Sequence, residues 1–242
     1  MGADTEHSIA IYDWANNKLK SSAKVGATHA LSPCPVSPSS LLPSAPQGDK
    51  AKILDVTFCP GSNADFVTVG VKHVKFWTSQ GQNLSGKKGI LGKKGKLQAF
   101  PCCAFVNKTF VCGTAGGEVY MFDDSRNLAK VIEGHKASVA NFFVTKDLLV
   151  SAGRDGSVVF FDKSISKSRA FDLKATLGAL SVKAGLRSVC VVGDGDEMKM
   201  VVGTEGSEIF EVSKALGWGA TDFGRSPNTR HCAVRAHNDH HR

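Results

Sequence analysis

Ser151–Asp162, with the sequence SAGRDGSVVFFD, is the clearest copy of a pattern that this chain repeats. Gly113–Asp123 (GTAGGEVYMFD) has the same order, a turn of small residues followed by alternating apolar residues. Looser copies are Gly70–Thr78 (GVKHVKFWT), Gly2–Asp13 (GADTEHSIAIYD) and Gly203–Val212 (GTEGSEIFEV). Alternation bounded by Gly, Asn, Asp and Ser is typical of short β-strands. The repeats therefore predict an all-β fold.

The spacing of the repeats indicates which all-β fold this is. The apolar runs close at Tyr12, Trp77, Phe122, Phe161 and Val212, so successive repeats lie 65, 45, 39 and 51 residues apart. Spacings of roughly 40–45 residues are typical of the four-stranded blades of WD40-type β-propellers. A closed propeller has about four to eight blades. We count about three complete blades plus partial ones, so the chain is predicted to form an incomplete propeller, which further blades or a second chain would have to close.

The apolar runs and the composition between them divide the chain into segments. For the clearest blade, strands are expected at residues 138–145, 148–153, 157–162 and 168–174. The fourth strand of the blade before Gln98 is expected near Leu84 or at 89–91, and the next strand at 98–105. The predicted organisation is a partial blade with third and fourth strands (1–27), a Pro/Ser-rich insertion loop (28–49), three blades (50–96, 97–133 and 134–174), a partial blade (175–216) and a disordered tail (217–242).

Four residues of the clearest blade match a WD40 pattern. His135 follows Gly134 and precedes Phe161 by 26 residues, which resembles the spacing between the GH and WD pairs of WD40 repeats. In that family a loop His, a turn Asp, a second-strand Ser or Thr and a third-strand Trp form a buried hydrogen-bonded network. His135, Asp155 and Ser151 match three of these positions, whereas Phe161 replaces the Trp and has no N–H to donate. The resemblance implies a structural network and not a catalytic dyad.

Composition places the chain among ordinary globular proteins. Hydrophobic residues make up 42% and charged residues 21% of 242 residues, and no run approaches the roughly 20 apolar residues of a membrane span. The N-terminus has no apolar signal segment. Seven cysteines without a CxxC pair predict reduced, buried thiols. We therefore expect a cytoplasmic protein without a membrane partner.

Catalytic and metal-binding motifs are lacking. The sequence contains no GxSxG, P-loop, HExxH or strand-associated dinucleotide-binding pattern. Asp194–Glu197 (DGDE) lacks the spacing of an EF-hand. The C-terminal histidines and cysteine fit no zinc pattern; they are His231, Cys232, His237, His240 and His241. No catalytic residue, cofactor or metal is therefore predicted, and the chain is expected not to be an enzyme.

Several segments resemble one atypical family of WD40 proteins. They are GADTEHSIAIYDW (2–14), ILDVTFCP (53–60), FVTVGVKHVKFWT (66–78) and SAGRDGSVVFFD (151–162), and they are similar to the echinoderm microtubule-associated protein-like (EMAP-like) family. Val71–Trp77 is the most specific of these matches. The resemblance implies a non-catalytic scaffold that binds microtubules or soluble tubulin. It also implies a cytoskeletal location in the cytoplasm, with cilia or flagella as a further option.

A lysine-rich segment is the candidate surface for an acidic partner. The net charge is +8, and positive charge gathered in one place attracts polyanions such as the acidic tails of tubulin. The lysines proposed for this role are Lys87, Lys88, Lys93, Lys94 and Lys96. A solvated loop without a partner is the alternative. Nucleic acid is disfavoured because residues 81–96 contain no aromatic side chain to stack on bases.

The blade pattern fits a second function as well. A WD40 adaptor in another assembly, such as ciliary, trafficking or ubiquitin machinery, would show the same repeats. The sequence leaves both functions open.

Overall fold

The computed structural model describes residues 8–24, 52–81, 83–173, 185–193, 198–207 and 209–213. The predicted insertion loop (28–49), the predicted tail (217–242) and Asp194–Glu197 lie outside these residues. Among the described residues there is no helix long and apolar enough to cross a membrane.

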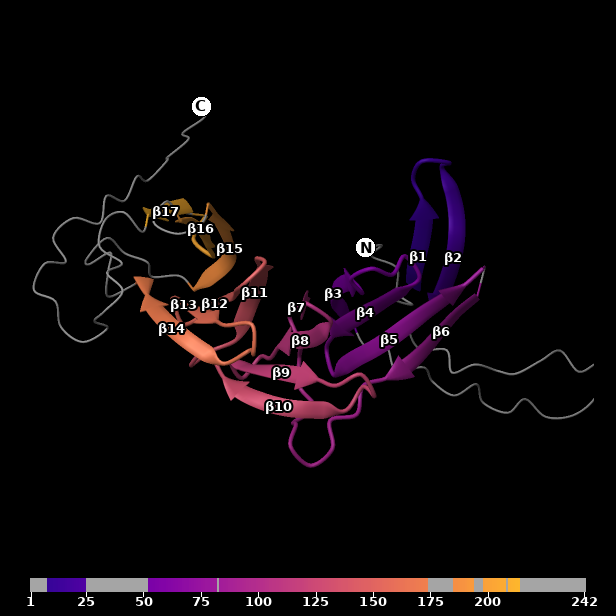
Figure 1. Cartoon of the computed structure of the whole chain (residues 1–242), viewed down its shortest axis with the longest axis horizontal. Coiled ribbons are helices and arrows are strands. Elements are labelled where there is room, and N and C mark those ends of the chain that lie inside the picture. Colours follow the sequence, from indigo (N-terminus) through magenta and orange to yellow (C-terminus); the bar gives the residue numbers. More distant parts are fainter. Residues whose placement is uncertain are drawn as a thin grey trace, which may run out of the picture.

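Three four-stranded antiparallel sheets form the middle of the molecule (Figure 1). The first contains β3 (Ile53–Phe58), β4 (Asp65–Gly70), β5 (His73–Gln80) and β6 (Asn83–Lys88). The second contains β7 (Cys103–Val106), β8 (Thr109–Gly113), β9 (Glu118–Phe122) and β10 (Leu128–Glu133). The third contains β11 (Val139–Val144), β12 (Leu149–Gly153), β13 (Ser157–Phe161) and β14 (Lys167–Asp172). Strands within each sheet follow chain order, as in a propeller blade.

Two smaller sheets flank these three. The hairpin of β1 (Ser8–Asp13) and β2 (Lys18–Lys24) lies beside the first four-stranded sheet, where β2 contacts β6. A three-stranded sheet of β15 (Leu186–Val192), β16 (Lys199–Thr204) and β17 (Ile209–Ser213) lies beside the third, where β15 contacts β11 and β12. Figure 1 shows the two small sheets at opposite ends of an open arc. The predicted all-β incomplete propeller is confirmed.

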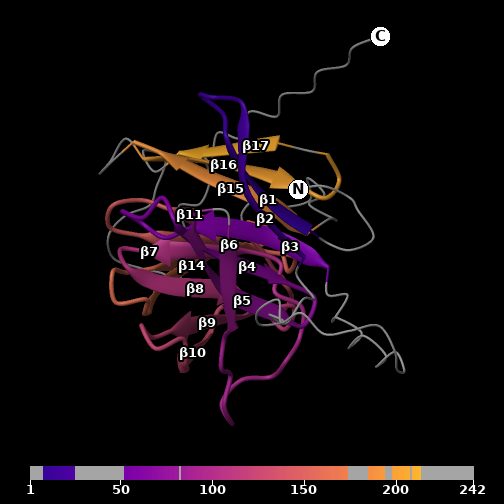
Figure 2. The same ribbon diagram turned by 90° about the vertical axis from the view of Figure 1, so that its right-hand side faces the viewer.

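Neighbouring sheets pack face to face, with their first strands side by side. β3 contacts β7, β7 contacts β11, and β11 contacts β15. Figure 2 views the resulting stack from the end that carries β1 and β2. Each middle sheet therefore has a neighbour on both faces. This explains why every residue of β12 is buried, whereas a sheet with one solvated face would alternate.

The hydrophobic core is divided into layers between the sheets. Between the first two four-stranded sheets, Val67, Val69 and Val74 pack with Phe110 and Phe122. The next layer includes Val111, Leu149 and Phe161, and the last includes Val150, Met200 and Phe210. Full burial of such a side chain contributes roughly 1.5–3 kcal/mol. The apolar residues of each repeat thus stabilise the contacts between blades as well as the blades themselves.

A polar contact recurs where first strands meet. The Asp55 carboxylate in β3 accepts a hydrogen bond from the N–H of Cys103 in β7, at 2.8 Å. The Asn141 side-chain oxygen in β11 accepts one from the N–H of Val189 in β15, at 3.3 Å. Asp55 and Asn141 each directly follow a register shift in the first strand. The irregularity turns these side chains towards the next sheet, so each forms a bond between blades.

The strands of the clearest blade are present, although the one expected at 168–174 ends at Asp172. β6 includes Leu84, so the first of the two predicted positions for that strand is confirmed. The strand expected at 98–105 begins only at Cys103. Residues before it bond to the turn of the preceding blade, with the N–H of Phe100 donating to Gly70 O at 3.0 Å and that of Lys72 to Gln98 O, also at 3.0 Å. This segment therefore joins two blades and is not part of one.

The cysteines follow their prediction in part. Cys102, Cys103 and Cys112 are buried, and burial raises the pKa of each thiol. The prediction of burial is wrong for Cys190, which is exposed on β15. β15 has a solvated face because its alternate side chains point away from the neighbouring sheet.

We predict that Asp55→Ala destabilises the chain by about 1–3 kcal/mol, because the N–H groups of Cys103 and Val56 both lose their acceptor. Asp55→Asn should cost less, since one side-chain oxygen remains to accept one bond. Urea unfolding followed by circular dichroism measures both effects. Equal stability of Asp55→Ala and the unchanged chain would show that this contact does not hold the blades together.

Candidate functional site

The structure brings three of the four network residues into direct contact. His135 precedes β11, and its Nε2 lies 2.7 Å from Ser151 Oγ in β12. Its Nδ1 lies 3.2 Å from Asp155 Oδ1 in the turn between β12 and β13. Nδ1 also lies 2.9 Å from Ser157 Oγ, and because a carboxylate only accepts, a hydrogen bond between Nδ1 and Asp155 uses a proton on Nδ1. Phe161 ends β13, is fully buried and packs in the apolar layer, where it adds no hydrogen bond to this group.

Asp155 connects the turn to the segment that enters the blade. Its carboxylate also accepts hydrogen bonds from the N–H of Lys136 at 2.8 Å and from the N–H and hydroxyl of Ser157 at 3.0 and 2.7 Å. Burial opposes ionisation, but the bonds from His135, Lys136 and Ser157 together lower the pKa of Asp155 well below its ordinary value. The His135 side chain is fully buried and that of Asp155 is 14% exposed. The group is thus enclosed and its hydrogen-bonding capacity is used.

Gly153 makes room for this network. A Cβ at position 153 would lie 2.5 Å from Asp155 Oδ1 and would overlap the His135 ring. A side chain there would displace the His–Asp contact. The glycine that ends β12 therefore has a steric role, in addition to marking the turn in the sequence.

A second network, not predicted from the sequence, lies in the first four-stranded sheet. The Trp77 Nε1–H donates to Thr68 Oγ1 at 2.9 Å, and Thr68 Oγ1 lies 2.7 Å from His73 Nε2. Thr68 is paired with Lys75, two residues before Trp77, and Ser151 is paired with Val159, two residues before Phe161. Thr68 and Ser151 therefore occupy equivalent positions in the second strands of their sheets. Here the Trp is present, and the histidine comes from the strand itself. The histidine and tryptophan of the segment Val71–Trp77 are the sequence features that could have predicted this network.

The five candidate lysines lie on β6 and on the segment that follows it, and they are not part of the His135 network. All five are exposed. Figure 1 shows the segment between β6 and β7 projecting as a loop beyond β10. Its backbone is held at both ends, since the Ile90 N–H donates to Arg126 O at 2.9 Å and the Lys96 N–H to the Tyr120 hydroxyl at 2.9 Å. We call residues 87–96 the lysine loop.

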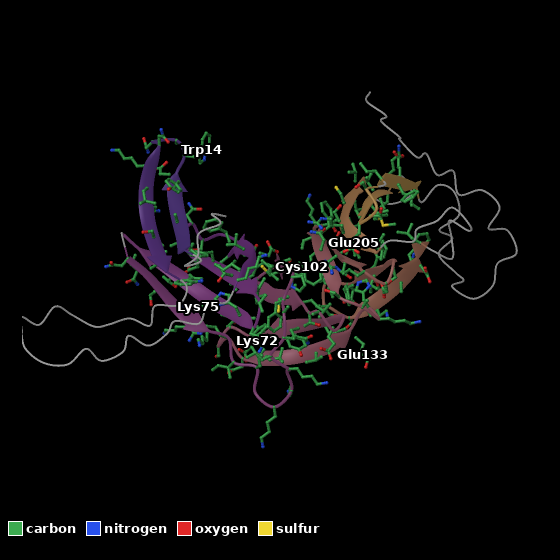
Figure 3. The ribbon with its side chains drawn as sticks, turned by 180° about the vertical axis from the view of Figure 1, so that it is seen from behind. Trp14, Lys72, Lys75, Cys102, Glu133 and Glu205 are labelled. Carbon is green, nitrogen blue, oxygen red and sulfur yellow. The ribbon has the colours of Figure 1, made fainter. Side chains whose placement is uncertain are left out.

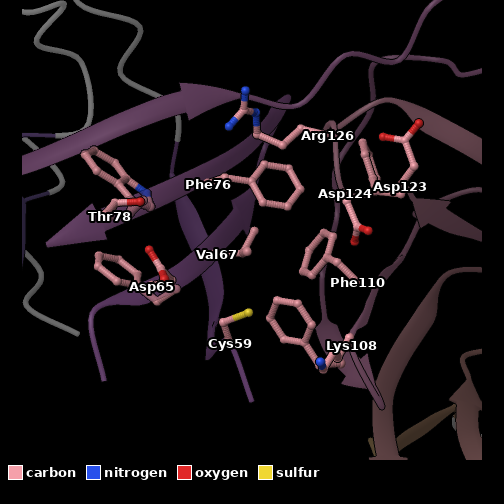
Figure 4. A pocket seen from close by; sticks show the side chains of 14 residues that line it. Cys59, Asp65, Val67, Phe76, Thr78, Lys108, Phe110, Asp123, Asp124 and Arg126 are labelled. Carbon is pink, nitrogen blue, oxygen red and sulfur yellow. The ribbon is translucent and has the colours of Figure 1, made fainter. Parts of the chain in front are cut away.

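An apolar hollow separates the first two four-stranded sheets (Figure 4). Its volume is about 210 Å³, and Phe76 and Phe110 meet in it edge to face with ring centroids 5.2 Å apart. Charges of both signs surround it, among them Asp65, Asp123 and Arg126. Mixed charge over an aromatic layer is typical of a seam between packed sheets. We assign no ligand to this hollow.

Asp155→Asn is predicted to lower stability at pH 7 by about 1–3 kcal/mol, because the amide offers one acceptor where the carboxylate offers two. The lowered pKa of Asp155 means that the ionised form stabilises the fold at neutral pH. That contribution is lost as the pH falls below the ordinary value of 3.8 towards the pKa of the folded state. Urea unfolding at pH 7, 5 and 3 should therefore show a smaller acid dependence for Asp155→Asn than for the unchanged chain.

Asp147→Asn is the matched control, because the Asp147 side chain makes an exposed ion pair with Lys163. Exposed ion pairs contribute little, so this variant should keep the acid dependence of the unchanged chain. An unchanged acid dependence in Asp155→Asn would show that the His135 network does not depend on the ionised carboxylate.

Sequence comparison connects the chain to proteins of known type. No family model matches it. It is 24% identical over 197 residues to Echinoderm microtubule-associated protein-like 4 of Xenopus laevis, across 74% of this chain and 19% of that protein. It is 27% identical over 171 residues to Echinoderm microtubule-associated protein-like 2 of Homo sapiens, across 69% of this chain and 25% of that protein. The chain therefore spans a quarter or less of the length of these relatives.

Solved structures share the fold. The β-propeller domain of Myceliophteria thermophila Cps50 (Swd1) superposes with a TM-score of 0.64 at 9% identity, covering 88% of this chain and 64% of that one. The computationally designed Ika8 protein superposes with a TM-score of 0.54 at 14% identity, covering 87% and 54%. Blades in an open arc and similarity to named relatives together confirm the predicted resemblance: the chain forms an incomplete β-propeller of WD40-type blades and is similar in sequence to echinoderm microtubule-associated protein-like proteins.

Proposed function

We propose that this chain is a non-catalytic scaffold of the EMAP-like type that binds microtubules or soluble tubulin. The observation that carries the proposal is the sequence similarity to two proteins named as microtubule-associated, which covers about 70% of the chain. The propeller blades support the coarser part, a protein-interaction scaffold. The chain spans only part of these relatives, so tubulin binding by this part is the step that needs testing.

The non-catalytic part of the proposal is supported by the state of the polar residues. His135 and Asp155 use their hydrogen-bonding atoms within the blade. His73 is likewise bonded to Thr68. An acid–base pair must reach a substrate, whereas these groups face each other inside the protein. Blade construction accounts for all of them.

We propose the lysine loop as the surface that meets the acidic partner. It combines five exposed lysines with a backbone that is bonded to the second four-stranded sheet. Charged groups on a fixed loop lose less entropy on binding than charges on a free segment. The corresponding location is the cytoplasm and its microtubules. The ciliary or flagellar option gains no support from the relatives found.

Replacement of Lys87, Lys88, Lys93, Lys94 and Lys96 by Gln should weaken microtubule binding at least about fivefold. Exposed ion pairs contribute roughly 0.2–1 kcal/mol each, and five lysines act together. Co-pelleting with microtubules, repeated across a salt series, measures the effect. Binding of the unchanged chain should fall as salt rises, and the variant should show a weaker salt dependence.

The control variant carries five Gln replacements at exposed lysines outside the loop, Lys18, Lys20, Lys108, Lys136 and Lys146. It loses the same charge, so equal weakening in both variants would contradict a role for the loop itself. Failure of the unchanged chain to pellet at low salt would contradict tubulin binding. Affinity capture of one stable complex without tubulin would then favour the adaptor function.

A further inference from the structure

A hollow of about 370 Å³ lies between β5, the end of β6 and the lysine loop. Lys72, Lys75 and Lys88 line it, and none of the described residues that line it carries a carboxylate. Leu91 and Leu97 form an apolar wall on the loop side. We call this the basic hollow. It shares Lys88 with the lysine loop, whereas Lys87, Lys93, Lys94 and Lys96 are not among its described lining residues.

The sheet holds two of its positive charges directly opposite each other. Lys75 of β5 pairs with Lys88 of β6 in the antiparallel register. Like charges in this position are destabilising. Lys75 is also only 8% exposed, and its burial together with the charge of Lys88 lowers its pKa. An anion in the hollow would be attracted to both charges, because Lys75 and Lys88 both line it.

Figure 3 labels Lys72 and Lys75, and the neighbours of Lys75 hold its side chain in place. Its Nζ lies 4.0 Å from the centroid of the Trp77 ring, a cation–π contact. Gly86, opposite Trp77 on β6, leaves the space that the lysine stem occupies, since a Cβ there would lie 2.5 Å from Lys75 Cε. The charge is therefore placed before any ligand arrives, which reduces the entropy lost on binding.

Lys72 brings a third charge from the turn between β4 and β5. Its backbone has a φ of 54°, in the left-handed region that costs a non-glycine residue roughly 1–2 kcal/mol. Its N–H donates to Gln98 O, which connects this turn to the segment after the lysine loop. Glycine would remove the backbone cost at this position, but it would also remove the charge.

We propose that the basic hollow binds a phosphorylated serine or threonine side chain of a protein partner. A phosphomonoester carries about −1.5 to −2 charge near pH 7 and three acceptor oxygens, so it matches several ammonium groups better than a single carboxylate does. Lys72, Lys75 and Lys88 all line the hollow, so together they would supply the positive charge that the phosphoryl oxygens meet. Leu91 and Leu97 contact apolar residues beside the modified one. The site does not depend on tubulin binding.

The test uses the full chain and a fluorescein-labelled peptide with one phosphoserine flanked by leucines, at about 0.15 M salt. Fluorescence anisotropy should show binding of this peptide and at least about tenfold weaker binding of its serine and glutamate counterparts, which corresponds to ~1.4 kcal/mol. Inorganic phosphate should displace the phosphopeptide from the unchanged chain, whereas chloride at equal ionic strength should not. Equal binding of the phosphoserine and glutamate peptides would overturn the proposal in favour of a general acidic-peptide surface.

A pair of double variants locates the site. Lys72→Gln with Lys88→Gln should weaken phosphopeptide binding at least about tenfold. Lys93→Gln with Lys94→Gln removes the same charge outside the hollow and should change it less than about twofold. All four lysines are exposed, so both variants should unfold at the same temperature as the unchanged chain. Equal weakening by the two variants, or no phosphopeptide binding at all, would overturn the assignment, whatever the outcome of the microtubule assay.

Discussion

Face-to-face packing of neighbouring sheets is the constraint on which the rest of this structure depends. A four-stranded sheet with two apolar faces is stable only when both faces are covered. β12 is buried along its whole length because it lies between the second four-stranded sheet and the three-stranded one. The hydrogen bonds that Asp55 accepts from Cys103 and that Asn141 accepts from Val189 connect neighbouring sheets at defined points. Apolar layers supply most of the free energy, and these bonds fix the position of one blade against the next.

Equivalent positions in the three four-stranded sheets are occupied by different side chains, and each is accommodated in a different way. Ser151 and Thr68 each carry a hydroxyl bonded to a histidine, but His135 enters from the preceding loop and His73 from the third strand. Cys112, opposite Tyr120 at the same place in the second four-stranded sheet, is buried in an apolar layer. A fully bonded network and an apolar layer are both acceptable there, whereas an unbonded polar group is not. The WD40 pattern is thus one solution among several within this chain.

Sequence reasoning predicted what depends on local pattern. Alternation and turn residues located β11 to β13, because strand formation and hairpin turns are decided over a few residues. It missed the start of β7, since residues 98–100 pair with a turn from the preceding blade and no local signal shows that contact. It also missed the Thr68–His73–Trp77 network, which resembles the expected one but obtains its histidine from a different place. The basic hollow combines Lys75 with Lys88, which the β5–β6 register places opposite each other.

The lysine loop and the basic hollow differ in how their lysines affect the stability of the fold. Lys93 and Lys94 are exposed on a loop, where their charges are hydrated and change the stability of the fold very little. A contribution to solubility is enough to explain their presence. Lys75 is buried opposite Lys88, a like-charge pairing, and Lys72 has a backbone φ of 54°; each of these features carries a cost that the exposed loop lysines do not. Solubility does not require either of them. The unfavourable lysines therefore argue for a specific ligand more strongly than the numerous exposed ones do.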